Sequence, residues 1–257
     1  MIDTFKKEIS TKAVNFYNQN GYLVIEDFFS TKINSKIKTA IDEIKKNKDI
    51  ELYYDKSGLI RRMENFTYKH KTFEFVNEEI KNLLLKLTSF KQSLFKDKVN
   101  FKPPKGEGFF AHYDGIFQFT TSEGKIRNGW YEYTNDYTNC LICLDNFTVE
   151  NGTLEISKSH TGNFEKLLKN TKNNGTPDIK DELISKLKFN PIIANSGSVV
   201  IFKHTCPHRS SPNYSKNDRG SLYLTYNKLE HGNFYNKYFL DKKNSKNPFK
   251  ALQGEQI

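Results

Sequence analysis

A change of sequence pattern near residue 97 constrains the fold of this chain more than any other feature. From there on, short apolar runs alternate with turn residues, at 98–102, 140–145, 152–157, 198–202 and 220–227. Runs of this length, bounded by Gly, Pro and Asn, predict β-strands. Five or more such strands in one segment predict a sheet that folds back on itself as a jelly-roll-like barrel. The polar stretch of about 163–190, rich in Asn and Lys, is predicted to be a helical insertion.

The first part of the chain, residues 1–96, has a mostly helical pattern. Apolar residues recur at helical spacing over 4–19, 31–47 and 72–87, and 22–25 is a short apolar run typical of a strand. Gly21 is placed to end the first helix and Ser30 to cap the second. No linker separates the two parts. The sequence therefore predicts one α+β domain over 1–257, with a double-stranded β-helix (jelly-roll) core at 97–257 and the N-terminal helices packed on its outside.

The positive net charge of the chain suggests a nucleic-acid partner at first, but the kind of cationic residue argues against one. The net charge is +10, but only five of the 40 cationic residues are Arg, the residue that grips phosphates and base edges in a bidentate way. We therefore expect no nucleic-acid partner. No stretch approaches the ~20 apolar residues of a membrane span, and the N-terminus has no signal-peptide pattern, so we expect a cytoplasmic protein without a membrane partner. Three cysteines form no disulfide framework and are interpreted as core thiols.

A possible metal site starts from two residues of a predicted strand end. His112 and Asp114 are two apart, so their side chains share one face of a strand. A third ligand is available from His208 or, as the alternative, His204. Two imidazoles and one carboxylate are the facial triad of non-heme iron(II) sites. Arg219, eleven residues after His208, offers a fork for the distal carboxylate of a 2-oxo acid, which favours His208 over His204.

With these residues the sequence resembles the phytanoyl-CoA dioxygenase family of Fe(II)- and 2-oxoglutarate-dependent oxygenases. The resemblance extends over segments 16–25, 100–104, 151–160 and 197–202 and over the run from His208 to Arg219. It implies that His112, Asp114 and His208 bind iron, that Arg219 binds 2-oxoglutarate with help from Ser210, and that O2 is the further cosubstrate. Because the family's halogenases lack the carboxylate ligand, Asp114 implies hydroxylation.

A narrower resemblance, to the 2-aminoethylphosphonate dioxygenase branch, rests on segments 58–66 and 98–104 and on Gly106 to Gly108. It implies hydroxylation of the carbon next to phosphorus in a small zwitterionic or anionic substrate, 2-aminoethylphosphonate or an N-methylated analogue. Cationic residues are expected at the phosphonate end, and carboxylates or aromatic rings at the ammonium end. The candidate substrate-binding residues are Arg61, Arg62, Glu64, Asn100, Lys102, Tyr113, Trp130 and Tyr131.

Several alternatives stay open at this level. The cluster of Arg61, Arg62 and Glu64 has the pattern of a surface ion pair, Lys102 is equally placed to bind 2-oxoglutarate or to face solvent, and the tyrosine-rich segment 130–137 is typical of an amphipathic hairpin. Residues 115–137 are expected to act as a lid. The same chemistry on an amino acid, a betaine or a natural-product intermediate, a zinc hydrolase with the same ligands, and a non-catalytic binding module are the competing functions.

Overall fold

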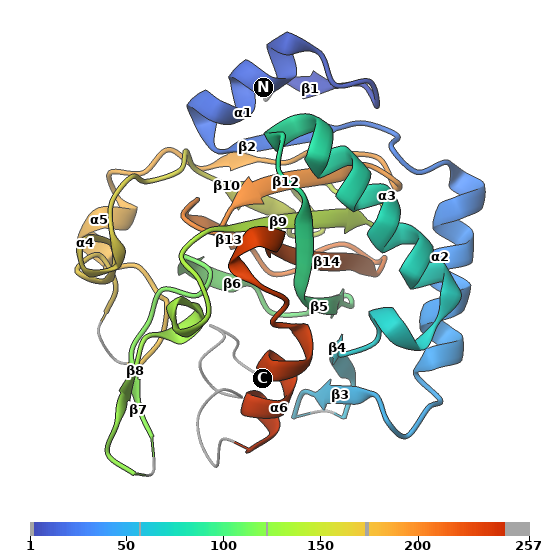
Figure 1. Cartoon of the computed structure of the whole chain (residues 1–257). Helices are drawn as coiled ribbons and strands as arrows, with labels where there is room; N and C mark the ends of the chain where they lie inside the picture. Colours follow the sequence, from blue (N-terminus) through green and yellow to red (C-terminus); the bar gives the residue numbers. More distant parts are fainter. Residues whose placement is uncertain (1–2, 57, 122, 173–174, 245–257) are drawn as a thin grey trace.

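Two facing β-sheets form the centre of the protein, whose structure is a computed structural model (Figure 1). It describes residues 3–56, 58–121, 123–172 and 175–244. The larger sheet has the strand order β1-β2-β12-β9-β14-β5-β4-β3 and the smaller one β11-β10-β13-β6. This is the expected α+β architecture with a jelly-roll core. No helix in these described ranges is long and apolar enough to cross a membrane.

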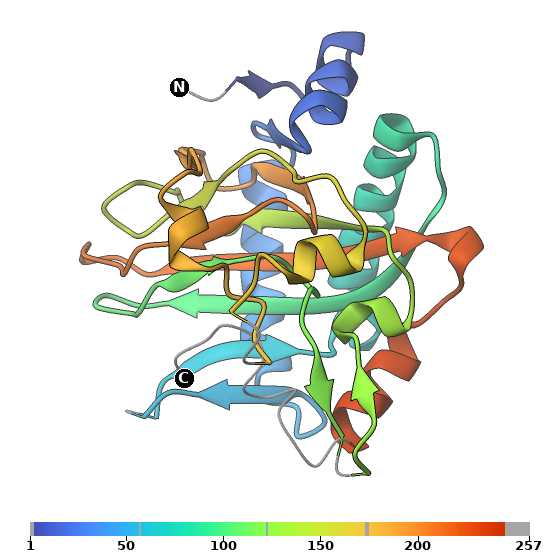
Figure 2. The same ribbon diagram turned by 90° about the vertical axis from the view of Figure 1, so that its left-hand side faces the viewer.

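The strands of the larger sheet come from the whole length of the chain. They are β1 (Thr4–Phe5), β2 (Tyr22–Ile25), β3 (Glu51–Tyr54), β4 (Ile60–Glu64), β5 (Gln92–Lys102), β9 (Tyr137–Cys143), β12 (Val199–Lys203) and β14 (Arg219–Lys228). The long pair β5 and β14 runs antiparallel, with Lys102 opposite Arg219. Figure 2 shows β3 and β4 beside β5 at the edge of this sheet.

The smaller sheet carries fewer and shorter strands. They are β6 (Phe109–His112), β10 (Leu154–Ile156), β11 (Asn190–Pro191) and β13 (His208–Ser210). A separate two-stranded hairpin consists of β7 (Phe119–Thr120) and β8 (Ile126–Arg127). Because β6 and β13 are neighbours, residues 112 and 208, nearly a hundred positions apart, lie directly opposite each other.

The helices lie on both sides of the sheets. They are α1 (Thr11–Asn20), α2 (Thr31–Ile44), α3 (Lys71–Thr88), α4 (Phe164–Leu168), α5 (Asp181–Ile184) and α6 (Tyr235–Asn244), with 3-10 turns η1 (Thr67–Lys69), η2 (Gly129–Glu132) and η3 (Leu229–His231). Figure 1 shows α2 and α3 on one side of the sheets and α4 and α5 on the other. Ser30 caps α2 by accepting the Ile33 N–H, and Gly21 ends α1 in the left-handed conformation, both as expected.

Two sequence expectations differ from the structure. The helix expected over 4–19 begins only at Thr11, because the Ser10 side chain caps it there and Thr4–Phe5 pairs in parallel with β2. Within the described residues of the insertion of about 163–190, the helices are α4 and α5. Between them Pro177, which has no N–H to give a helix, lies in an extended stretch that pairs with the end of β6.

Alternation along β5 and β14 separates the apolar core from a polar interior. Val99 of β5 and Leu222 of β14 belong to the core that the outer face of the large sheet forms with helices such as α3. A second core lies between the two sheets and contains residues such as Leu141 and Ile156. At the other end of the space between the sheets, the inward positions of β5 are Lys96, Lys98, Asn100 and Lys102. This polar end is where the candidate site lies.

Candidate metal centre

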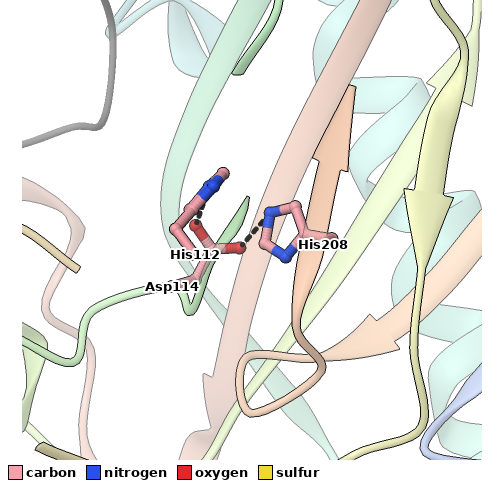
Figure 3. A group of neighbouring side chains, drawn as sticks. All are labelled: His112, Asp114 and His208. Atoms are coloured by element: carbon pink, nitrogen blue, oxygen red, sulfur yellow. Dashed lines mark ion pairs between the residues drawn. The ribbon is translucent and has the colours of Figure 1, made fainter. Parts of the chain in front are cut away.

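Three side chains meet where β6 and β13 pair. His112 ends β6, Asp114 follows two residues later, and His208 begins β13 directly opposite His112. His112 Nε2 lies 4.0 Å from Asp114 Oδ1, and His208 Nε2 lies 3.5 Å from Asp114 Oδ2 (Figure 3). One ligand atom from each residue falls within 4.8 Å of the others. The three residues therefore lie close enough together to bind a single metal ion.

Hydrogen bonds orient all three groups. The Nδ1 atoms of His112 and His208 lie 2.7 Å and 3.0 Å from the carbonyl oxygens of Phe110 and Cys206, so each ring donates from Nδ1 and keeps the Nε2 lone pair. The Asn139 amide donates to Asp114 Oδ2 at 2.8 Å. Asn139 in turn accepts a hydrogen bond from Thr225, which fixes the amide orientation. The triad is thus preorganised with its free atoms turned inward.

The electrostatics favour the metal-binding protonation states. Burial and the neighbouring His112 together lower the pKa of His208 to about 4, so this imidazole is neutral at neutral pH. Burial alone would raise the pKa of Asp114, but electrostatic interactions with His208, His112 and Lys98 bring this pKa below its ordinary value. A neutral imidazole next to an ionised carboxylate is the state that a divalent cation requires.

The alternative ligand His204 has a different role. Its Nε2 lies 3.0 Å from the hydroxyl of Tyr131, and its Nδ1 bonds to the backbone of Tyr137. The His204 carbonyl accepts the N–H of Asp114 at 3.0 Å. His204 therefore supports the loop that carries Asp114, and Tyr131, expected to contact substrate, is bonded to this histidine instead.

A second group of polar residues lies further along the same interior. Lys102 Nζ donates to Ser210 Oγ at 2.7 Å and to the carbonyls of Ser211 and Gly152. Burial lowers the pKa of Lys102 to about 6. Arg219, opposite Lys102 in the sheet, is 3% exposed and stacks over the ring of Phe147 at 4.8 Å. The Arg219 Nε has no hydrogen-bond partner within the described part of the chain. A buried guanidinium with an unbonded N–H group is suited to bind an anion.

A cluster of buried charges borders the metal ligands on the other side; we call it the cation cluster, and it consists of Arg62, Lys96, Lys98 and Lys242. Its single carboxylate is Glu64, which contacts Lys242 and, at 3.5 Å, Arg62. Burial would raise the pKa of Glu64, but Lys242, Lys96 and Arg62 lower it to about 2. Burial lowers the pKa of Lys96 to about 7 and of Lys98 to about 8.

Lys96 and Lys98 also line a cavity that reaches the metal ligands. The residues lining this cavity are Lys96, Lys98, His112, Tyr113, Asp114, Gly115, Phe117, Trp130, Pro177 and Tyr238. The Lys98 ammonium stands 4.7 Å from the centre of the Tyr223 ring, and no hydrogen bond or ion pair of Lys98 is found among the described residues. The Lys98 ammonium on the wall of this cavity thus has no hydrogen-bonded or ion-paired partner in the described part of the chain, and Asp114 and Glu64 attract it only from a longer distance.

The remaining expected substrate residues lie at different distances from this cavity. Arg62 bonds to Asn100, and both face inward beside the cation cluster. Trp130 lines the cavity from η2, which replaces the expected hairpin at that point. Tyr113 lines it too, with its hydroxyl bonded to His160. Arg61 points to the opposite face of β4, where it bonds to the Phe101 carbonyl and to Asp55.

Sequence reasoning missed Lys96, Lys98, Lys242 and Tyr238. A signal for the first two was present, because residues 96, 98, 100 and 102 are polar at period two and the apolar Val99 and Phe101 alternate with the last three. Lys242 and Tyr238 carried no such signal. They reach the site only because α6 packs back against β4 and β5, with Lys96 donating to the Tyr238 hydroxyl at 3.3 Å.

The sequence comparison decides the family. The model of the phytanoyl-CoA dioxygenase (PhyH) family matches residues 17–221. The chain belongs to the phytanoyl-CoA dioxygenase family. It is therefore a dioxygenase of the iron- and 2-oxoglutarate-dependent type, as the sequence resemblance implied.

Curated relatives and solved structures agree with this assignment. The chain is 29% identical to 2-aminoethylphosphonate dioxygenase of the uncultured bacterium HF130_AEPn_1 over 88% of this chain and 85% of the relative. It is 26% identical to methylphosphonate hydroxylase of Gimesia maris over 97% and 92%. Among solved structures, EctD from S. alaskensis with 2-oxoglutarate and 5-hydroxyectoine shares the fold, with a TM-score of 0.67, 16% identity and coverage of 87% and 77%.

Proposed function

We propose that this family member hydroxylates a small phosphonate, with His112, Asp114 and His208 holding Fe(II) and Arg219 holding 2-oxoglutarate. The observation that carries the proposal is the shared cavity: His112 and Asp114 line it together with Lys96 and Lys98. A substrate anion held by these cations would lie beside the metal. The names of the relatives, which act on phosphonates, support the same substrate class.

The donor set fits Fe(II). Two neutral imidazole Nε2 atoms and one carboxylate converge from β6, the turn after it and β13, and these are ligands suited to Fe(II). When bound there, Fe(II) with 2-oxoglutarate and O2 supplies the oxidising power for C–H hydroxylation. The Asn139–Thr225 hydrogen bonds hold the Asp114 carboxylate in place during turnover.

Arg219 and Ser210 fit the distal carboxylate of 2-oxoglutarate. The Arg219 guanidinium is buried, and its Nε has no partner in the described ranges, so a carboxylate would supply the missing acceptor. Ser210 faces the same interior as His208, two residues away on β13. Lys102 Nζ bonds to Ser210 Oγ at 2.7 Å and so fixes the position of this hydroxyl in the interior. Lys102 itself acts here as a positioning residue rather than as a ligand of the substrate.

The cation cluster fits a phosphonate. Four cations surround one carboxylate, Glu64, which is already bonded to two of them. A phosphonate at neutral pH carries between one and two negative charges and three acceptor oxygens, so it matches both the charge and the hydrogen-bonding capacity of Lys98 and its neighbours. Phe117, Trp130 and Tyr238 line the same cavity and exclude water from it.

The test is substrate-dependent release of succinate. Purified protein loaded with Fe(II) and 2-oxoglutarate is expected to release succinate in step with a small phosphonate and not with amino acids or betaines, and Asp114→Ala is expected to abolish release. Turnover that continues with Zn(II) but without O2 or 2-oxoglutarate would identify a hydrolase instead. Coupled turnover with a betaine or amino acid, and none with phosphonates, would reject the phosphonate assignment while leaving the oxygenase class intact.

A further inference from the structure

Asp178 is a carboxylate next to the metal centre that no step above uses. It lies in the 163–190 insertion, one residue after Pro177, which lines the cavity. Asp178 forms an isolated antiparallel bridge with His112. The Tyr113 N–H bonds to the Pro177 carbonyl and the Ile179 N–H to the Ala111 carbonyl, so residues 112 and 178 are a pair without hydrogen bonds between them.

This pairing places the Asp178 side chain on the metal-binding face. Directly opposed residues of an antiparallel pair project to the same side, and in a pair of this type their side chains are at their closest. The His112 imidazole points to the metal site. The Asp178 side chain therefore leaves its strand on the same side as the His112 imidazole, from the smaller sheet, whereas the cation cluster approaches the cavity from β4, β5 and α6 of the larger sheet.

One carboxylate oxygen of Asp178 also lacks the hydrogen bond that a buried carboxylate oxygen normally has. Asp178 Oδ1 is buried and has no hydrogen-bond partner, and within the described ranges it is the one buried carboxylate oxygen in this condition. Buried polar atoms of native proteins almost always have a hydrogen-bond partner. A bound substrate can therefore supply the donor that this carboxylate oxygen lacks.

Other carboxylates near the cavity are already engaged. Glu64 is held by Lys242 and Arg62, and Asp114 is a metal ligand candidate. The acids of the tyrosine-rich segment 130–137 bond elsewhere: Glu132 pairs with Arg127 at 2.8 Å and Asp136 with Lys228 at 3.5 Å. Of these carboxylates, Asp178 is the one with a buried oxygen that has no hydrogen-bond partner within the described ranges.

From this geometry we infer that Asp178 binds the ammonium end of the substrate, so the substrate is an aminophosphonate rather than a phosphonate without an amine. The inference rests on the proposed function and deepens it. The phosphonate would lie against Lys98 and its neighbours, the ammonium against Asp178, and the carbon next to phosphorus between them, near the metal ligands His112 and Asp114. Asp178 is then a specificity-determining residue.

The test compares 2-aminoethylphosphonate with propylphosphonate, in which a methyl group replaces the ammonium at nearly equal size. Wild-type enzyme is expected to prefer the amine. Asp178→Asn is expected to raise the KM for 2-aminoethylphosphonate about 10- to 100-fold and to leave the KM for propylphosphonate and for 2-oxoglutarate unchanged. Asp178→Glu, which keeps the charge, should restore part of the preference. Asp181→Asn, an exposed Asp three residues further on, is the matched control and should behave as wild type.

The outcomes separate the two claims. Equal losses on both substrates in Asp178→Asn, or a wild-type preference for propylphosphonate, would overturn the role of Asp178 while the proposed function stands. Absence of coupled turnover with any phosphonate in the wild type would refute the proposed function, and the role of Asp178 with it. Thermal unfolding of each variant shows whether a loss reflects folding, and calorimetric binding of the two phosphonates without O2 gives the preference independently of turnover.

Discussion

Replacing Lys98 by Met tests whether the cation cluster binds the substrate anion. Lys98 lines the cavity beside His112 and Asp114, and its ammonium has no hydrogen bond or ion pair to the described residues. Met keeps the length and apolar character of the stem while removing the charge. We expect Lys98→Met to fold as the wild type does, because no internal salt bridge is broken, and to bind an anionic substrate more weakly.

The size of the effect follows from the surroundings of Lys98. Two unit charges 4 Å apart attract by about 4 kcal/mol at an effective dielectric constant of ~20. Part of this energy offsets the loss of water from the ammonium and the phosphonate, so a charge-assisted hydrogen bond contributes roughly 1.5–3 kcal/mol net. Since 1.36 kcal/mol corresponds to a factor of ten, the KM for a phosphonate should rise about 10- to 100-fold. The pKa of Lys98, lowered by burial to about 8, leaves the ammonium charged at neutral pH.

The assay is 2-oxoglutarate turnover at varied phosphonate and at varied 2-oxoglutarate. Lys98→Met should raise the KM for the phosphonate and leave that for 2-oxoglutarate unchanged, because Arg219 lies elsewhere in the interior. Lys91→Met, an exposed Lys just before β5, is the control for loss of one positive charge from the protein. An unchanged phosphonate KM in Lys98→Met, or an equal rise for 2-oxoglutarate, would refute the assignment of the cluster.

Three further predictions concern the neighbouring groups. Glu64→Gln should lower the unfolding free energy by roughly 3 kcal/mol at pH 7, because the folded protein lowers the pKa of Glu64 from 4.5 to about 2. The difference in unfolding free energy between wild type and variant should shrink as the pH falls from 4.5 to about 2. Denaturant unfolding at several pH values measures this difference. Asn139→Ala frees the Asp114 carboxylate to rotate and should weaken Fe(II) affinity about 10- to 100-fold, measured by anaerobic titration. Arg219→Lys keeps the charge but loses the planar fork, so the KM for 2-oxoglutarate should rise at least ~10-fold while the phosphonate KM stays constant.

The fold and the grouping of the three candidate metal ligands were predictable because each depends on a local pattern. The strands after residue 97 follow from short apolar runs between turn residues, and His112 and Asp114 share a face because two residues make one period of a strand. His208 was separable from His204 by its spacing to Arg219, and the structure accounts for His204 through its bonds to Tyr131 and the Asp114 backbone.

The substrate pocket was predictable only in part because its walls meet through long-range pairing. The pairing of Arg62 with Asn100 joins β4 to β5, which no spacing within either segment indicates. Lys102, expected to contact substrate, bonds instead to Ser210 and to two carbonyls of the neighbouring turns. Lys242 comes from a helix that the apolar pattern of the sequence did not reveal, because half of that helix is polar and exposed.

The charges of the interior also bear on what the net charge of the protein means. Most of the excess of Lys over acidic residues lies on the exposed surface, but four cations are gathered on one side of the metal centre around a single bonded carboxylate. Such a group is costly to bury without a counter-ion. Fe(II) increases the positive charge, and 2-oxoglutarate offsets it mainly at the metal and at Arg219. On the proposed function, the positive charge around Lys98 would be left for the substrate to compensate. Burying these cations would then lower the stability of the free protein, and the binding of a phosphonate would offset that loss.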